Sequence, residues 1–157
     1  MRVIACDQAT KISGFSVFDD GNYTDSGIID KHKIKDSNER AAAMGTAICE
    51  KLEELHPDCV VIENVQAQEG VSTVILLARL QGMIIGWCYA HKIRVEVVEP
   101  SKWRKCLGYQ QGPGVKREDL KWQSISYVQE HLGFDDFSED RCEACCLGIA
   151  AHKLLNF

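Results

Sequence analysis

Five short runs of apolar residues along the chain predict five β-strands. The runs cover residues 2–7, 14–18, 23–29, 59–63 and 95–98. The run at 59–63 is apolar without alternation, which is typical of a central parallel strand covered on both faces. Between the second and third runs, Asp19-Asp20-Gly21-Asn22 indicates a hairpin turn. The first three strands are therefore expected to form an antiparallel meander.

Helical patterns follow the third strand and then alternate with the last two. Asp36-Ser37-Asn38 can cap a helix that runs to about Leu55, where His56-Pro57 stops it. Further helices are predicted at 72–92, from Pro100-Ser101 onward, at 116–132 and after the cap residue Ser138. This order predicts an α/β fold. We expect a mixed five-stranded sheet, made of a three-strand antiparallel meander plus two parallel strands, with helices on both faces.

The segment 72–92 is apolar on nearly every side. Its length could suggest a membrane span, but Arg79 and Gln81 in its middle, together with two glycines, argue against one. A helix that is apolar nearly all round needs cover on more than one side. We therefore expect this helix to pack on the sheet and to form part of a homodimer interface, without a membrane.

The composition fits one globular domain. The chain has 157 residues, of which 45% are hydrophobic and 26% charged, so a single domain over 1–157 is expected. Its N-terminus lacks the long apolar stretch of a secretory signal, so a cytoplasmic location is expected. The eight cysteines are expected to be reduced and mostly buried. Cys142, Cys145 and Cys146 could instead hold zinc or an iron–sulfur cluster, although no matching ligand pair occurs elsewhere.

The charge distribution changes what the net charge suggests. A net charge of −5 argues at first against a nucleic-acid partner, because Lys and Arg drive phosphate binding. Residues 99–122, however, carry six basic against three acidic side chains. The basic residues are Lys102, Arg104, Lys105, Lys116, Arg117 and Lys121. This concentration predicts a DNA-binding segment, and an ordinary solvated helix face is the alternative.

Four acidic residues stand where a carboxylate is costly. Asp7 and Glu63 end the first and fourth strands, and Asp140 and Glu143 share one face of the closing helix. Such carboxylates need something positive beside them. Oxygen ligands without His or Cys favour magnesium or manganese, and two ions about 3.5–4 Å apart can bind the attacking water and the leaving 3′ oxygen of a phosphodiester. Each acid also has an ordinary alternative, such as the helix dipole for Asp140.

Three motifs built on these acids resemble the RuvC-type Holliday junction resolvases of the RNase H-like superfamily, particularly their short phage-type relatives. The motifs are Ile4 to Val17, Val61 to Val65 and Asp140 to Ala150. The resemblance covers nearly the whole chain and implies an RNase H-like fold. It also implies a homodimeric endonuclease that nicks Holliday junctions or other branched DNA. A phage-encoded protein acting in the host cytoplasm fits the same resemblance.

The resemblance also implies roles for individual residues. All four acids would be catalytic metal ligands for two Mg²⁺ ions, which Mn²⁺ could replace, with Asp7 bridging both. The family places basic residues near the scissile phosphate, and Lys105 and Lys116 occupy the corresponding stretch. Of the two, Lys116 is expected to contact the phosphate or stabilise the transition state.

Several positions depart from the family pattern. Gln8 and Ala9 replace the usual Pro and Gly, and Gln66 stands where bacterial resolvases commonly carry an aromatic residue. Glu69 lies where a basic residue would help to hold DNA, and Glu143 replaces the more usual Asp. These departures favour a broader branched-DNA nuclease that also cuts forks, flaps or three-way junctions.

Other classes of protein stay open at this point. Asp7, Thr10 and Gly14 loosely fit the phosphate loop of actin-like ATPases, although that fold needs two such domains. A non-catalytic binding module would be expected to lose at least one acid. Ribonuclease H and other superfamily nucleases share the same carboxylates. Trp122 is expected in the core, and stacking of Trp103 or Tyr109 on DNA bases stays open.

Overall fold

The computed structural model describes residues 1–67, 70–134 and 138–157, and in these ranges the chain forms five strands and five helices. The strands are β1 (Arg2–Asp7), β2 (Ile12–Asp19), β3 (Asn22–Asp30), β4 (Cys59–Glu63) and β5 (Arg94–Val98). The helices are α1 (Ser37–Leu55), α2 (Val71–Ala90), α3 (Pro100–Cys106), α4 (Arg117–Leu132) and α5 (Glu139–Leu155). The predicted order of elements is therefore confirmed, although β2 and β3 are longer than expected.

The strands form one mixed sheet in the order β3-β2-β1-β4-β5. β1, β2 and β3 pair in antiparallel fashion, whereas β4 lies parallel to both β1 and β5. The turn between β2 and β3 uses left-handed backbone at Asp20 and Gly21, with φ of 50° and 81°, which suits a tight hairpin. The predicted antiparallel meander followed by two parallel strands is confirmed.

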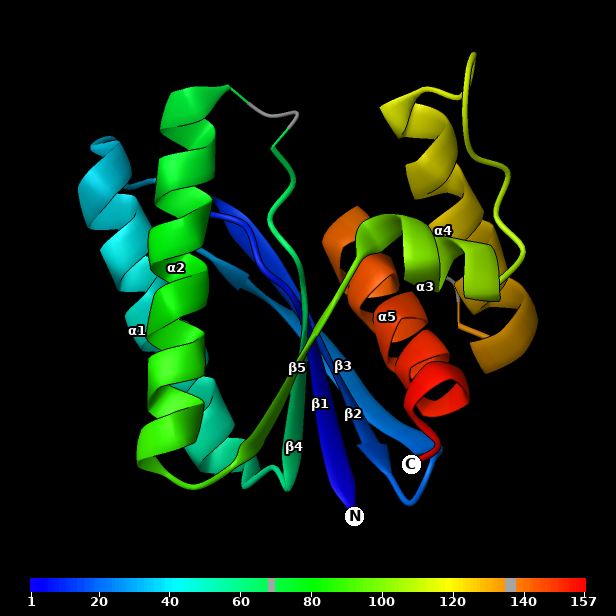
Figure 1. Ribbon diagram of the computed structural model, residues 1–157, viewed down its shortest axis with the longest axis horizontal. Helices are drawn as coiled ribbons and strands as arrows, with labels where there is room; N and C mark the ends of the chain where they lie inside the picture. The colour runs from blue at the N-terminus through cyan, green and yellow to red at the C-terminus, as the bar shows by residue number, and fades with distance from the viewer. Residues whose placement is uncertain (68–69, 135–137) are drawn as a thin grey trace.

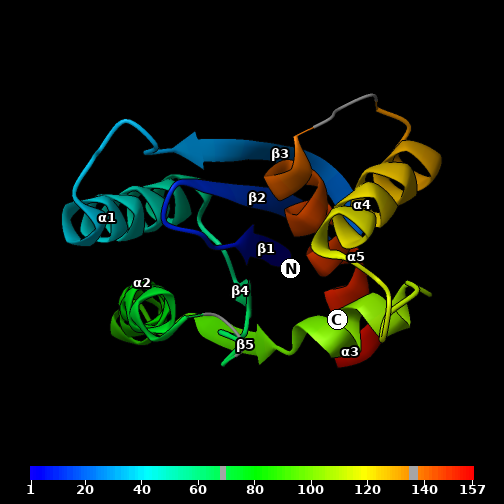
Figure 2. The ribbon, with the colours of Figure 1, turned by 90° about the horizontal axis from the view of Figure 1, so that it is seen from above.

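Helices cover both faces of this sheet. In Figure 1, α1 and α2 lie on one side, and α5, α3 and α4 lie on the other; the view from above in Figure 2 agrees. Successive side chains of a strand point to opposite faces. Accordingly, Ile4 and Cys6 of β1 pack with α1 and α2, while Val3 and Ala5 pack with α5. Asp7 follows Val3 and Ala5 in this alternation, so its side chain points to the face of the sheet that α5 covers.

Two helix caps and one tryptophan show where short-range sequence rules hold and where they fail. Asp36 caps α1 as predicted, since its side chain accepts hydrogen bonds from the backbone of Asn38 and Glu39. Ser138 precedes α5, but its side chain makes no capping hydrogen bond. The prediction that Trp122 lies in the core is wrong. The residue is 59% exposed because α4 turns Ser124, Ile125 and Val128 toward the core instead.

None of the eight cysteines forms a disulfide, and six of them are buried. Cys142, Cys145 and Cys146 lie on α5 within the hydrophobic core that this helix shares with the sheet, α3 and α4. Cys146 Sγ accepts a hydrogen bond from the Tyr109 hydroxyl at 3.2 Å. These thiols are therefore part of the packing of α5. Glu69, one of the departures from the family pattern, lies outside the described residues.

Candidate active site

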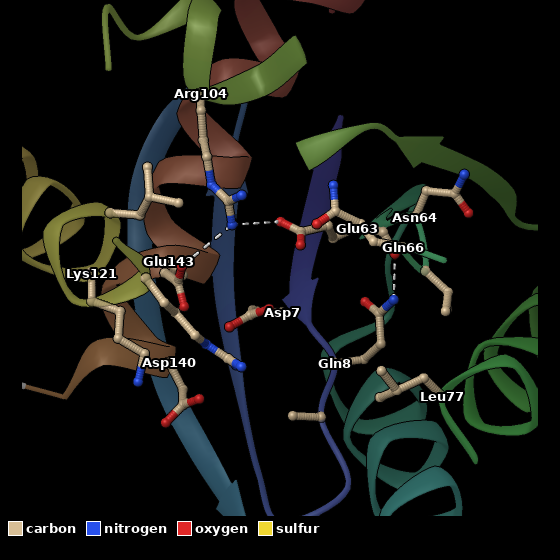
Figure 3. A pocket seen from close by; sticks show the side chains of 14 residues that line it. Asp7, Gln8, Glu63, Asn64, Gln66, Leu77, Arg104, Lys121, Asp140 and Glu143 are labelled. Atoms are coloured by element: carbon tan, nitrogen blue, oxygen red, sulfur yellow. Dashed lines mark hydrogen bonds and ion pairs between the residues drawn. The ribbon is translucent and has the colours of Figure 1, made fainter. Parts of the chain in front are cut away.

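The parallel pairing of β1 and β4 places two of the four acids side by side. Cys6 is opposite Ile62 in this ladder, so Asp7 and Glu63, one residue further on, end the two strands together. Alternation puts both side chains on the face that α5 covers. Asp140 and Glu143 come from the first turns of α5, and a pocket of about 310 Å³ is lined by all four acids (Figure 3). The four acids therefore line one pocket, as the strand pairing leads one to expect.

Close contact between α5 and β2 holds the other two acids in place. A Cβ atom on Gly14 would stand 1.9 Å from the backbone oxygen of Asp140, so only glycine permits this approach. Ser16, two residues along β2, donates a hydrogen bond to the Ala144 carbonyl at 2.7 Å. Gly148, one turn further along α5, packs against Phe18 so closely that a Cβ would lie 2.3 Å from the ring. These small residues thus allow α5 to pack closely against β2.

A guanidinium group lies between two of the carboxylates. Arg104 Nη2 is 3.6 Å from Glu63 Oε2 and 3.6 Å from Glu143 Oε1, and its side chain is only 14% exposed. The Trp103 indole N–H donates to Glu63 Oε2 at 2.7 Å. Figure 3 shows Arg104 reaching from α3 toward both glutamates. Residues from β4, α3 and α5 therefore form one charged network.

The carboxyl groups hold more negative charge than Arg104 compensates. Burial raises the pKa of Asp7 well above its usual range, and the charges of Glu143 and Glu63 add to this. Burial, reinforced by Glu63 and opposed by Arg104, raises the pKa of Glu143 to about 7. Burial also raises the pKa of Glu63 and of Asp140. Such a cluster of hard oxygen donors fits a divalent cation, which would favour the ionised form of every member.

The four acidic side chains line one pocket without converging on a single point. Within the described ranges, no group of three or more His, Cys, Asp or Glu side chains stands close enough to hold a metal ion. Arg104 lies between Glu63 and Glu143, at 3.6 Å from each. The backbone nevertheless brings all four acids to one pocket.

The basic residues of the predicted segment divide into two groups. Arg104, Arg117 and Lys121 line the pocket, and Lys121 forms an ion pair with Glu139. The exposed residues Lys102, Lys105 and Lys116 are not among the lining residues. Lys116 occupies the N-cap position of α4, where its backbone N–H donates to Asp119 Oδ2 at 2.8 Å.

The sequence identified Lys105 as a basic residue near the scissile phosphate, but it did not predict that Arg104 and Trp103 contact Glu63. A signal was present, because Pro100, Trp103, Arg104 and Leu107 follow helical spacing along one face of α3. Pro100 and Trp103 are buried, so Arg104 shares their side of the helix while Lys105 is turned outward. Two further side chains at the site, Gln8 and Gln81, carried no recognisable sequence signal for a role there.

Known proteins share both the sequence pattern and the fold of this chain. Residues 3–116 match the model of the family described as crossover junction endodeoxyribonuclease RuvC. A protein of that name from Caldicellulosiruptor saccharolyticus is 23% identical over 99% of this chain and 93% of its own length. Another, from Clavibacter michiganensis, is 27% identical over 96% of this chain and 75% of its own length.

Solved structures with the same fold support the sheet topology. T. thermophilus RuvC in complex with a Holliday junction substrate has a TM-score of 0.76 and 13% identity, over 99% of this chain and 96% of that one. Fowlpox virus resolvase, in complex with Holliday junction DNA, has a TM-score of 0.71 and 16% identity, over 99% of both chains. The predicted RNase H-like fold is confirmed. From the family match and the common sheet, we conclude that this chain belongs to the RuvC family of crossover junction endodeoxyribonucleases.

Proposed function

We propose that this protein is a metal-dependent, structure-selective endodeoxyribonuclease that nicks Holliday junctions or other branched DNA by hydrolysing phosphodiester bonds. The observation that carries the proposal is the pocket that Asp7, Glu63, Asp140 and Glu143 line, with basic side chains at its wall. The two related proteins with solved complexes are bound to Holliday junctions, which supports DNA of this shape as the substrate.

The four carboxylates would hold two Mg²⁺ ions, with Mn²⁺ as a substitute. Asp7 is the candidate for a shared ligand, because the charges of the other three acids all act on its carboxyl group. When bound, such ions activate a water molecule and stabilise the leaving 3′ oxygen. The chain itself orients Glu63 through the Trp103 indole N–H. Arg104 offsets part of the negative charge next to Glu63 and Glu143.

The basic side chains would hold the DNA backbone. Arg117 and Lys121 line the same pocket as the acids, so a phosphate entering it would meet both. Lys102, Lys105 and Lys116 are exposed on α3 and at the start of α4, where they can contact neighbouring phosphates. Lys116 is proposed as the phosphate contact that acts in the reaction. Contacts of this kind position a substrate without reading its sequence.

The test is a cleavage assay on a single gel. Purified protein with Mg²⁺ is given four-way, three-way, flap, linear and RNA–DNA hybrid substrates. Preferential nicking of branched DNA is expected, and preference for the hybrid would instead indicate a ribonuclease. Asp7→Asn and Glu63→Gln should abolish cleavage while a four-way junction is still bound, because phosphate contacts do not depend on these carboxylates. Retained nicking by Asp7→Asn would sink the assignment.

We also propose that the protein acts as a homodimer through α2. This helix is long and apolar enough to cross a membrane by length and composition. Its side chains Val71, Ile75 and Tyr89 are exposed. An exposed apolar groove of about 460 Å³ runs between α2 and α1. Apolar surface of this extent is usually covered by a partner.

Polar contacts of α2 favour a second copy of the chain over a membrane as that cover. Arg79 Nη1 donates to the Asn38 side chain at 2.8 Å, and Gln81 donates to the Glu63 carbonyl at 3.0 Å. Leu80 and Ile84 are packed in the core with α1 and the sheet. A membrane span would have to give up these contacts. Residues 1–157 would then act as one nuclease domain, and eight cysteines without a disulfide suit the cytoplasm.

A further inference from the structure

Gln8 follows Asp7 directly at the end of β1, and its side chain forms part of the wall of the acidic pocket. Only 9% of the residue is exposed. Figure 3 shows its amide with the nitrogen toward the end of β4 at Glu63 and the oxygen on the side of Asp7. A neutral amide therefore lies within a group of four acids.

The backbone of Glu63 sets the orientation of this amide. The Gln8 side-chain N–H donates to the Glu63 carbonyl oxygen, and Gln81 on α2 donates to the same oxygen at 3.0 Å. A carbonyl oxygen accepts two hydrogen bonds and donates none, so both of its positions are filled. If the Gln8 amide were rotated by half a turn, its oxygen would face the Glu63 carbonyl oxygen, and these two acceptors would repel each other. Oε1 must therefore point away from the Glu63 carbonyl.

Gln8 Oε1 has no partner within the protein. It is closed off from bulk solvent, and no described residue donates a hydrogen bond to it. A buried acceptor without a partner is unfavourable. The nearby acids offer no donor when they are ionised. A partner for Oε1 must carry a proton to donate or a positive charge.

We propose that Gln8 Oε1 is a fifth oxygen group of the metal site, placed in the coordination shell of the divalent cation held by Asp7, directly or through one bound water molecule. The inference rests on the proposed function, since it requires that the acids bind a metal. Amide oxygens are suitable ligands for Mg²⁺ and Mn²⁺. Because the amide is neutral, it adds an oxygen without increasing the repulsion among the carboxylates.

Mn²⁺ binding to the whole protein, measured by isothermal titration calorimetry, tests the inference without an activity readout. Gln8→Met keeps the length of the side chain and removes its oxygen. The affinity for Mn²⁺ should fall about 10-fold or more, as for other groups that support a metal ligand shell. Gln81→Met is the matched control, because it removes only the second donor to the Glu63 carbonyl. Its Mn²⁺ affinity should stay within about twofold of wild type.

Gln8→Glu separates the oxygen from the amide donor. This variant keeps an oxygen on the side of Asp7 but sets a second acceptor against the Glu63 carbonyl, so its Mn²⁺ affinity should stay above that of Gln8→Met. Equal losses in Gln8→Met and Gln81→Met would make Gln8 a support for the Glu63 backbone only. Unchanged affinity in Gln8→Met would mean that a buried water satisfies Oε1. If wild type and Asp7→Asn bind Mn²⁺ equally poorly, the metal site of the proposed function fails as well.

Discussion

Gly14 on β2 and Asp140 on α5 are so close that no other residue fits at position 14. A Cβ atom there would be 1.9 Å from the Asp140 carbonyl oxygen and 2.4 Å from its carbonyl carbon. Both contacts are to backbone, which cannot move aside as a flexible side chain can. The position of one acid in the pocket therefore depends on the absence of a side chain on a neighbouring strand.

Gly14→Ala should displace the start of α5 and remove Asp140 from the pocket. Forcing extra volume into a packed site costs about 1–3 kcal/mol in the free energy of unfolding. Cleavage of a four-way junction should be lost even at a temperature where circular dichroism reports a folded protein. Gly70→Ala is the control, because a Cβ at Gly70 meets no atom within 4 Å. Wild-type cleavage by folded Gly14→Ala would contradict this account.

Arg104→Gln should destabilise the metal-free protein by roughly 1–3 kcal/mol, because it leaves Glu63 and Glu143 without their compensating charge. Added Mg²⁺ should restore most of the loss. Thermal unfolding in EDTA and in Mg²⁺ measures both effects. Lys105→Gln, at the adjacent but exposed position, should change the free energy of unfolding by no more than about 0.5 kcal/mol. Similar losses in the two variants would argue against a special place for Arg104.

The stability of the metal-free protein should decrease with rising pH. Glu143 has a pKa of about 7 in the folded chain against an ordinary value of 4.5, so the folded state binds more protons between these pH values. The free energy of unfolding should therefore fall by on the order of 3 kcal/mol across this window. Urea unfolding in EDTA at several pH values measures it. Glu143→Gln should make the profile less steep, with the remaining slope due to Asp7, Glu63 and Asp140, whose pKa values are also raised. A rise in stability over the same window would refute the assignment.

Lys116→Ala should weaken DNA binding and cleavage without loss of stability. The residue is exposed at the N-cap of α4, so the free energy of unfolding should change by no more than about 0.5 kcal/mol. Loss of one phosphate contact lowers the slope of log K against log salt by about 1. Lys92→Ala is a fitting control, since Lys92 precedes β5 at the other end of the sheet from the pocket. Parallel losses of melting temperature and activity would make Lys116 structural.

Gly86→Glu should convert a dimer into monomers. A Cβ at Gly86 meets no atom within 4 Å, so one copy of the chain accommodates the new side chain. A charge on the exposed apolar face of α2 would nevertheless prevent close pairing with a second copy. Light scattering at micromolar concentration should give half the wild-type mass. Ser126→Glu is the control, because Ser126 is an exposed residue of α4, on the opposite face of the sheet from α2. This variant should leave the mass unchanged. A monomeric wild-type protein would overturn the proposal.

The strand pattern and the acids could be predicted because both follow short-range rules. Alternation along β1 and β4 decides which face Asp7 and Glu63 share, and parallel pairing brings their ends together. The phase of α3 was harder to predict because the helix has only seven residues, and a shift of one residue exchanges Arg104 for Lys105. Gln8 could not be assigned, since its orientation depends on a carbonyl 55 positions away.

Because α5 supplies two of the four acids, the pocket can form only after this helix has been synthesised and has packed on the sheet. Asp7 and Glu63 are synthesised before Asp140 and Glu143, because α5 follows every strand of the sheet along the chain. A nascent or proteolytically shortened chain that lacks α5 would hold two of the four acids and an open sheet face. If the four acids act as proposed, such fragments would be unable to cut DNA, and the docking of one helix would restrict nuclease activity to chains that have folded through α5.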